Sequence, residues 1–189
     1  MLLAEYLSEN IHRLGIVCGL GNLSQSDSNN AMGLIQRLAV KSIRAFPKLV
    51  LLLNRYISSS YGNHPFINRF PNIAFKIAIS GAPKVDRDAL MNEESKNIIL
   101  TSAQEAFRQG GEGAAWDIYL ATQHWQANLL NIKTKTYLWH GELDTTVPIK
   151  MAYEHAKHIP HCQTTFLPKE GHFSLPLNHI KTILSQLIK

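Results

Sequence analysis

The last third of the chain alternates short apolar runs with amphipathic segments, and this alternation limits the fold more than any other feature. Residues 135–139 and 163–167 are typical of strands, whereas residues 149–158 and 176–188 have the apolar spacing of helices. A helix between two strands provides the crossover that parallel strands require. The order therefore predicts βαβ units, a parallel sheet and an α/β fold.

A smaller part of this pattern lies near the N-terminus. Residues 1–11 have the apolar spacing of a helix, and residues 14–20 resemble a short buried strand bounded by glycines. A serine-rich polar loop follows, and apolar residues then recur mainly at helical spacing until the last third begins. We therefore expect residues 1–21 and 133–189 to form a core with a partial parallel sheet, and residues 22–132 to form a helical insert.

The composition fits a globular protein of this kind. The chain has 189 residues, of which 45% are hydrophobic and 17% charged, so it can bury a core and does not resemble a disordered protein. The 19 Lys and Arg residues against 14 Asp and Glu give a net charge of +5, but the basic residues are scattered singly. Because nucleic-acid binding needs clustered positive charge, we expect no nucleic-acid partner.

The cysteines and the apolar runs of the sequence indicate a cellular compartment. Cys18 and Cys162 have no second cysteine at metal-binding or redox spacing, so we expect buried free thiols in a reducing environment. The N-terminus lacks the pattern of a secretory leader, and the longest apolar run, residues 49–53, is too short to cross a bilayer. We expect a soluble, cytoplasmic protein with no membrane partner.

Two loops that follow neighbouring predicted strands carry the side chains best suited to catalysis. Residues 139–148 include Asp144, and residues 167–174 include His172. Because ligands bind beyond the carboxyl ends of parallel strands, both side chains should face one crevice. A carboxylate that accepts from the imidazole Nδ1–H leaves Nε2 free as a general base. We expect a carboxylate oxygen of Asp144 within about 3.5 Å of a ring nitrogen of His172.

Simpler interpretations of these residues stay open at this point. Asp144 precedes Pro148 and a predicted helix, so it could serve only as a helix cap, with His172 as an ordinary surface residue. Glu142 is the spare carboxylate of the first loop, and we expect it to be a solvated loop residue.

The order strand, His-Gly-x-x-Asp-x-x-Val-Pro, helix, strand, Gly-His, helix resembles the carboxyl-terminal third of the α/β-hydrolases. The segment 106–110, followed by Gly113 and a helix, resembles the helical cap of that superfamily. The resemblance implies part of an α/β-hydrolase fold with an inserted cap, in which Asp144 is the triad acid and His172 the base. It implies hydrolysis of an ester- or amide-type bond in a small apolar substrate through a covalent intermediate, without a metal or an organic cofactor.

The sequence lacks the motif that would carry the nucleophile of that triad. The superfamily carries it on a Gly-x-Ser-x-Gly turn between a strand and a helix, and this sequence has no such motif. The resemblance places that turn upstream of residue 1. An alternative nucleophile is Ser80 in Ala78–Ala82, a relaxed version of the turn after an apolar stretch, whereas Ser174 is too near His172 in the chain to be a good partner.

The absence of this motif leaves three hypotheses for the chain. It is the acid-and-base part of a hydrolase, one half of a split hydrolase, or a non-catalytic remnant that serves as an interaction module. If the neighbouring strand of the family is missing, the strand at Leu14–Cys18 should keep one edge unpaired. We then expect self-association or a partner chain at that edge, and esterase activity of the lone chain no greater than that of a His172→Ala variant.

Three further patterns have ordinary explanations. His155, His158 and His161 with Cys162 lack a carboxylate that would complete a zinc site, so we expect no metal there. Gly19-Leu20-Gly21 is only the first half of a dinucleotide-binding motif, so we expect a turn. Asp86 should cap a helix that begins at the next residue.

Overall fold

The computed structural model describes residues 1–7, 9–21, 23, 34–50, 52, 69–108, 112–123 and 128–188. The chain divides into two compact units. The first consists of Met1–Asn22, Pro83–Ala89 and Trp125–Lys189, and the second of Leu23–Ala82 and Leu90–His124. Pro83–Ala89, which lies within the range expected to form the insert, thus groups with the sheet.

The first unit contains a three-stranded parallel sheet. Its strands are β1 (Arg13–Val17), β2 (Lys135–Gly141) and β3 (Cys162–Leu167), in the order β1-β2-β3. Ile16 of β1 pairs with Leu138 of β2, and Leu138 pairs with Thr164 of β3. The predicted α/β class and parallel sheet are therefore confirmed.

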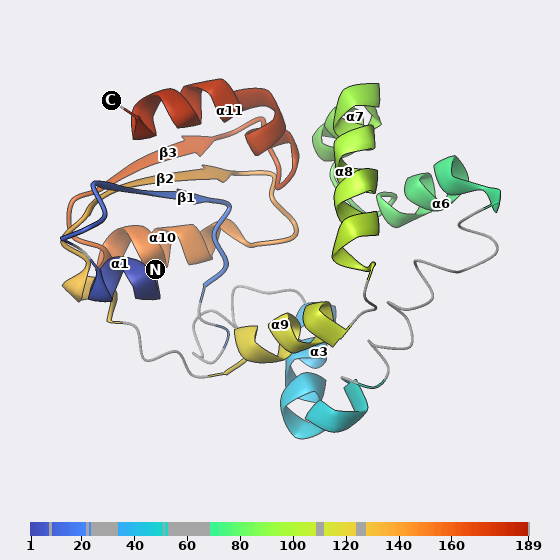
Figure 1. Ribbon diagram of the computed structural model, residues 1–189, viewed down its shortest axis with the longest axis horizontal. Coiled ribbons are helices and arrows are strands. Elements are labelled where there is room, and N and C mark those ends of the chain that lie inside the picture. The colour runs from blue at the N-terminus through green and yellow to red at the C-terminus, as the bar shows by residue number, and fades with distance from the viewer. Residues whose placement is uncertain are drawn as a thin grey trace. The chain divides into compact units, whose positions relative to one another are not determined.

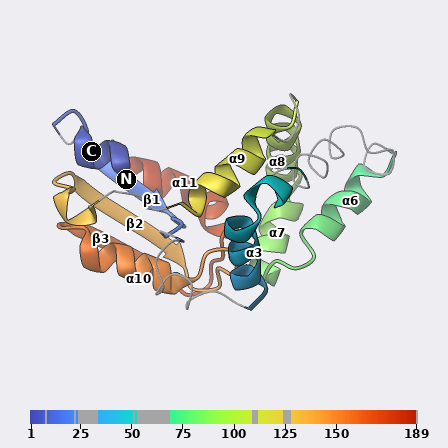
Figure 2. The same ribbon diagram turned by 90° about the horizontal axis from the view of Figure 1, so that it is seen from below.

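Helices cover both faces of this sheet. On one face lies α11 (Ser174–Leu187), and on the other lie α10 (Ile149–His158) and the short helix α1 (Leu2–Tyr6) (Figure 1). Turned by 90°, the sheet has α10 and α1 in front of it and α11 behind (Figure 2). A short 3-10 helix, η1 (Leu129–Asn131), leads into β2. Because both faces are covered, β2 is buried along almost its whole length.

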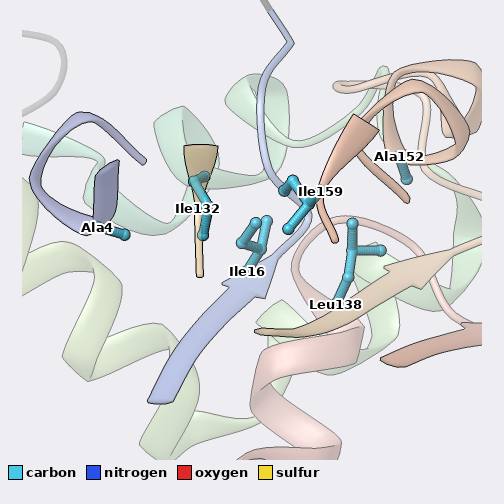
Figure 3. Packing of buried hydrophobic residues seen from close by; sticks show 6 residues of the cluster. All are labelled: Ala4, Ile16, Ile132, Leu138, Ala152 and Ile159. Atoms are coloured by element: carbon cyan, nitrogen blue, oxygen red, sulfur yellow. The ribbon is translucent and has the colours of Figure 1, made fainter. Parts of the chain in front are cut away.

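The alternation of side chains along β2 divides the core between the two faces. Leu138 points toward α10 and packs in a cluster that also contains Ala4, Ile16, Ile132, Ala152 and Ile159 (Figure 3). Tyr137 and Trp139 point to the opposite face, where they pack with Cys18, Leu175 and Ile183. Successive strand residues face opposite sides of a sheet, so one strand supplies both halves of the core.

The regular secondary structure in the described part of the second unit is helical, with turns between some of the helices. Its helices are α3 (Leu34–Ala45), α6 (Pro71–Ala78), α8 (Glu93–Ala106) and α9 (Glu112–Ala121), while α7 (Lys84–Met91) begins in the first unit and ends in the second. The side chain of Asn92 caps α8 by accepting hydrogen bonds from the amides of Glu94 and Ser95.

Three predictions about the ends of helices and strands are wrong. The first helix ends at Tyr6 rather than near residue 11. The first strand ends at Val17, because Cys18 has a φ of +48° and turns the chain out of the extended conformation. Asp86 lies inside the first turn of α7 and does not cap it.

The first strand has a free edge in the described part of the chain. There, β1 pairs with β2 alone, so its second edge has no strand beside it. Among the described residues, no helix is long and apolar enough to cross a bilayer.

Candidate active site

Two loops at the carboxyl ends of β2 and β3 form the candidate site, and backbone hydrogen bonds join them. The amide of Glu142 donates to the carbonyl of Leu167 (3.0 Å), and the amide of Leu143 donates to the carbonyl of Glu170 (2.9 Å). Each bond connects the segment after β2 to the end of β3 or the segment after it. The loops are therefore held together by their backbones, independently of the site's side chains.

Asp144 lies on the first loop with a buried side chain whose two oxygens have different partners. Oδ1 accepts hydrogen bonds from the amides of Thr146 (2.8 Å) and Val147 (2.7 Å), which holds the turn that leads into α10. Oδ2 lies 2.8 Å from Nδ1 of His172. Asp144 thus caps a turn and contacts His172 at the same time, so the two interpretations of this residue are compatible.

The predicted contact between Asp144 and His172 is confirmed at 2.8 Å. The carboxylate is fully buried, whereas 24% of the imidazole side chain is exposed. Because the two nitrogens lie on opposite sides of the ring, Nε2 faces away from Asp144. The pair therefore has the arrangement in which a carboxylate fixes an imidazole whose other nitrogen can exchange protons.

The surroundings of Asp144 favour its charged form. Burial alone would raise the pKa of the carboxyl group, but the hydrogen bond with His172 and the one from the Val147 amide, with the charges of His172 and His140, lower it below its usual value. Asp144 is therefore a carboxylate at neutral pH, as an acceptor for Nδ1–H must be.

A second histidine lies behind Asp144. His140, at the end of β2, is completely buried, and its Nε2 lies 2.9 Å from the carbonyl oxygen of Val147 and 3.5 Å from Oδ2 of Asp144. Sequence reasoning did not select His140, although it stands four residues before Asp144 in the same motif. His140 thus contacts the same carboxylate oxygen as His172, and its contact with the Val147 carbonyl connects the end of β2 to the loop that follows.

Cys18 also lies beside the pair. One ligand atom each of Cys18, Asp144 and His172 lies within 4.8 Å of the others, so by spacing these three side chains could hold a metal ion. The Cys18 thiol is buried, donates to the carbonyl of Gly171 (3.8 Å), and has its pKa raised to about 12, chiefly by burial and then by the charge of Asp144. The side chain is therefore a protonated thiol at neutral pH.

The histidines of residues 155–161, where we expect no metal site, lie in different environments. His155 is buried on α10, and its pKa is lowered to about 4 by burial and by the nearby positive charges of His140, the N-terminus and His158. His158 is half-buried, and its Nδ1 lies 2.8 Å from the carbonyl oxygen of Glu154. Cys162 is half-buried at the start of β3, so of the two cysteines only Cys18 is buried as expected.

The other candidates occupy unremarkable positions. Glu142 is exposed, as expected. Ser174 is buried, and its hydroxyl oxygen accepts from the amide of Gly171 (2.8 Å), which makes it part of the loop's structure. Ser80 belongs to the second unit and follows helix α6 rather than a strand, and its exposed hydroxyl donates to the carbonyl of Ile77 (2.8 Å).

Comparisons with solved structures identify the fold. A thermophilic esterase from Thermogutta terrifontis and a bromoperoxidase from Bacillus anthracis both match with a TM-score of 0.54, at 13% and 15% identity. An α/β hydrolase fold protein from Nakamurella multipartita matches with a TM-score of 0.50 at 13% identity. Each match covers 98% of this chain, and 60%, 61% and 63% of the three proteins in that order.

These matches confirm the predicted fold. The chain has part of the α/β-hydrolase fold and spans about 60% of the length of the first two solved structures that it matches. No protein-family model matches the sequence, and no curated protein does.

Proposed function

We propose that this chain is the acid-and-base part of a hydrolase that cleaves an ester- or amide-type bond in a small apolar molecule. The observation that carries the proposal is the 2.8 Å contact between Asp144 and Nδ1 of His172 at the carboxyl ends of β2 and β3. The α/β-hydrolase fold of the matched structures supports it. The nucleophile would come from a segment outside these 189 residues.

His172 would act as the general base. Its Nε2 would take the proton of the nucleophile, give it to the leaving group, and then activate the water that releases the product. Asp144 would hold the ring in one tautomer and stabilise the imidazolium that forms. General acid–base catalysis of this kind contributes roughly 10²- to 10⁴-fold to the rate.

Ser80 stays the alternative nucleophile within the chain. The residues before it form helix α6, whereas the nucleophile turn of the fold follows a strand. The side chain also donates its proton to the Ile77 carbonyl rather than to an imidazole. Both features favour a nucleophile from elsewhere.

The proposal includes the remaining expectations. The reaction would need neither a metal nor an organic cofactor, because acid and base chemistry is supplied by Asp144 and His172. The substrate would be a small apolar ester or amide, and the enzyme would work in the cytoplasm.

One observation favours a second candidate function, in which the chain binds another polypeptide. The chain would then be either one half of a split hydrolase or a non-catalytic interaction module. Within the described residues, β1 leaves one edge of the sheet without a strand partner. Such an edge offers unpaired backbone groups to another polypeptide. A second chain that supplies the adjoining strands would complete the sheet and could also supply the nucleophile.

A serine-directed fluorophosphonate probe tests the proposal. It should be applied to the purified chain, to any longer product of the same reading frame, and to His172→Ala versions of both. We expect labelling of a nucleophile-bearing product that the His172→Ala substitution abolishes. No labelling of any form, alone or with a co-purifying chain, would instead favour an interaction module. Labelling of the 189-residue chain that Ser80→Ala removes would assign the nucleophile to Ser80.

A further inference from the structure

Asp86 is a buried carboxylate that the proposed reaction does not use. It lies in the first turn of α7, in the segment Pro83–Ala89 that belongs to the same compact unit as the sheet. None of its side chain is exposed. A buried charge is stable only when hydrogen bonds replace its hydration, so the partners of this carboxylate indicate its purpose.

Its partners are three successive backbone amides around the candidate base. Oδ2 accepts from the amide of His172 (3.0 Å), and Oδ1 accepts from the amides of Phe173 (3.0 Å) and Ser174 (2.8 Å). These amides lie at the N-terminus of helix α11, where the first backbone N–H groups of a helix have no acceptor within the helix itself. Asp86 therefore caps α11, although it precedes Ser174, the first residue of that helix, by 88 residues in the sequence.

The approach between this carboxylate and the loop is close. A Cβ atom on Gly171 would lie 2.5 Å from Oδ1 and Oδ2 of Asp86, so only glycine fits beside it. The loop is also held by the Ser174 hydroxyl, which accepts a hydrogen bond from the Gly171 amide. The backbone of His172 thus has little freedom to shift relative to Asp86.

The number of donors explains why a carboxylate is needed. Two oxygens with about four acceptor sites can satisfy three amides, and the negative charge also suits the positive end of α11. An asparagine would offer one oxygen and would direct its NH₂ group at an amide that also donates. Asp86→Asn therefore removes at least one of the three hydrogen bonds while nearly preserving the shape of the side chain.

We infer that Asp86 is a positioning residue for His172. Asp144 holds the imidazole ring, and Asp86 holds the backbone that carries it, so two buried carboxylates fix the same histidine at its two ends. This inference rests on the proposed role of His172 as the base. The structural part of the inference is that Asp86 sets the position of the imidazole relative to Asp144. This part can be tested without an assay of enzymatic activity.

The test compares Asp86→Asn with Asn92→Ala by proton NMR. The side chain of Asn92 also caps a helix, but this helix is α8. The Asn92→Ala substitution therefore controls for the loss of stability that follows from removing a helix cap. In the parent chain, the Nδ1 proton of His172 shared with Asp144 should give a far-downfield resonance. We expect Asp86→Asn to abolish that resonance or to speed its exchange with water about tenfold or more, and Asn92→Ala to leave it unchanged. A folded Asp86→Asn protein with an unchanged resonance would overturn the inference.

Hydrogen exchange in the unaltered chain provides a second measurement that does not depend on a variant folding. The amides of His172, Phe173 and Ser174 should exchange as slowly as those of β2, because all three bond to a buried acceptor. Fast exchange of these amides alongside a protected β2 would show that Asp86 does not hold the loop. Absence of any hydrolase activity would refute the proposed function and leave both of these results intact.

Discussion

A Cβ atom on Gly141 would lie 2.6 Å from the carbonyl oxygen of Gly171, and closer still to that of Glu170. The glycine of the His-Gly pair and the glycine of the Gly-His pair are thus in direct backbone contact across the two loops. Asp144 and His172 lie on these two loops, so Gly141 is needed for the close approach of the loops, whereas Gly171 is needed because a Cβ there would meet the carboxylate of Asp86.

Substitution of either glycine should therefore destabilise the protein. We expect Gly141→Ala and Gly171→Ala each to lower the free energy of unfolding by about 1–3 kcal/mol or more, because the obstructing atoms are backbone or a firmly bonded carboxylate. Urea denaturation measures the effect. Gly113→Ala is the matched control, since its Cβ position has no described atom within 4 Å apart from its chain neighbours and its own helix backbone, and the residue is helical. It should be neutral or stabilising by less than about 1 kcal/mol, and equal losses at all three sites would contradict the close-contact explanation.

His155 should make stability depend on pH in a defined range. Its pKa is about 4 in the folded chain against an ordinary value of 6.5. Above pH 6.5 the group is neutral in both states, so stability is complete. Between pH 6.5 and 4 the unfolded chain binds a proton that the folded chain does not, so stability falls, by at most about 3.5 kcal/mol. Below pH 4 this contribution levels off.

Urea titrations at several pH values test this expectation. His155→Leu should flatten the dependence of the unfolding free energy on pH between 6.5 and 4, because the neutral side chain has no proton to bind. His158→Gln, on the same helix and half-buried, should retain most of the slope. A parent protein equally stable at pH 6.5 and pH 4.5 would show that His155 is not held in its neutral form.

The two cysteines should differ in reactivity. Burial is the first cause that raises the pKa of Cys18 to about 12, and the thiol also donates to Gly171 in the interior. Burial raises the pKa of Cys162 as well, but that side chain is partly exposed. Alkylation depends on thiolate and access, so iodoacetamide at pH 8 should modify Cys162 first and Cys18 only after denaturation. Mass spectrometry of timed samples measures this, with Cys162→Ala as the control, and early modification of Cys18 would show that the site opens.

The sequence predicted those parts of the site that follow from the order of elements. Asp144 and His172 lie in the loops that follow two consecutive strands of a parallel sheet, and that topology brings them to one edge. Cys18 was predicted only as a buried thiol, because its place beside Asp144 depends on the pairing of β1 with β2 across more than a hundred residues. Asp86 was assigned to its own helix because the rule for caps is local, whereas its actual partners lie 86 to 88 residues away.

The free edge of β1 leads to an expectation about association. Helix α1, whose Ala4 packs in the same buried cluster as Ile16 of β1, exposes Leu3 (69%) and Tyr6 (71%). Exposed apolar side chains next to an unpaired strand favour contact with another polypeptide. We propose that purified chains associate through this surface, so the sedimentation coefficient should rise with concentration.

Paired substitutions locate the surface. Leu3→Glu with Tyr6→Glu should reduce the rise in sedimentation coefficient, because two charges cannot be buried in the contact without partners. Ile73→Glu with Ile77→Glu, on α6 of the second unit, is the matched control: these side chains are 50% and 61% exposed but belong to no sheet edge. Loss of association in the control pair alone would place the contact on the helical unit. A chain that stays monomeric at every concentration would show that the edge of β1 is protected without a partner.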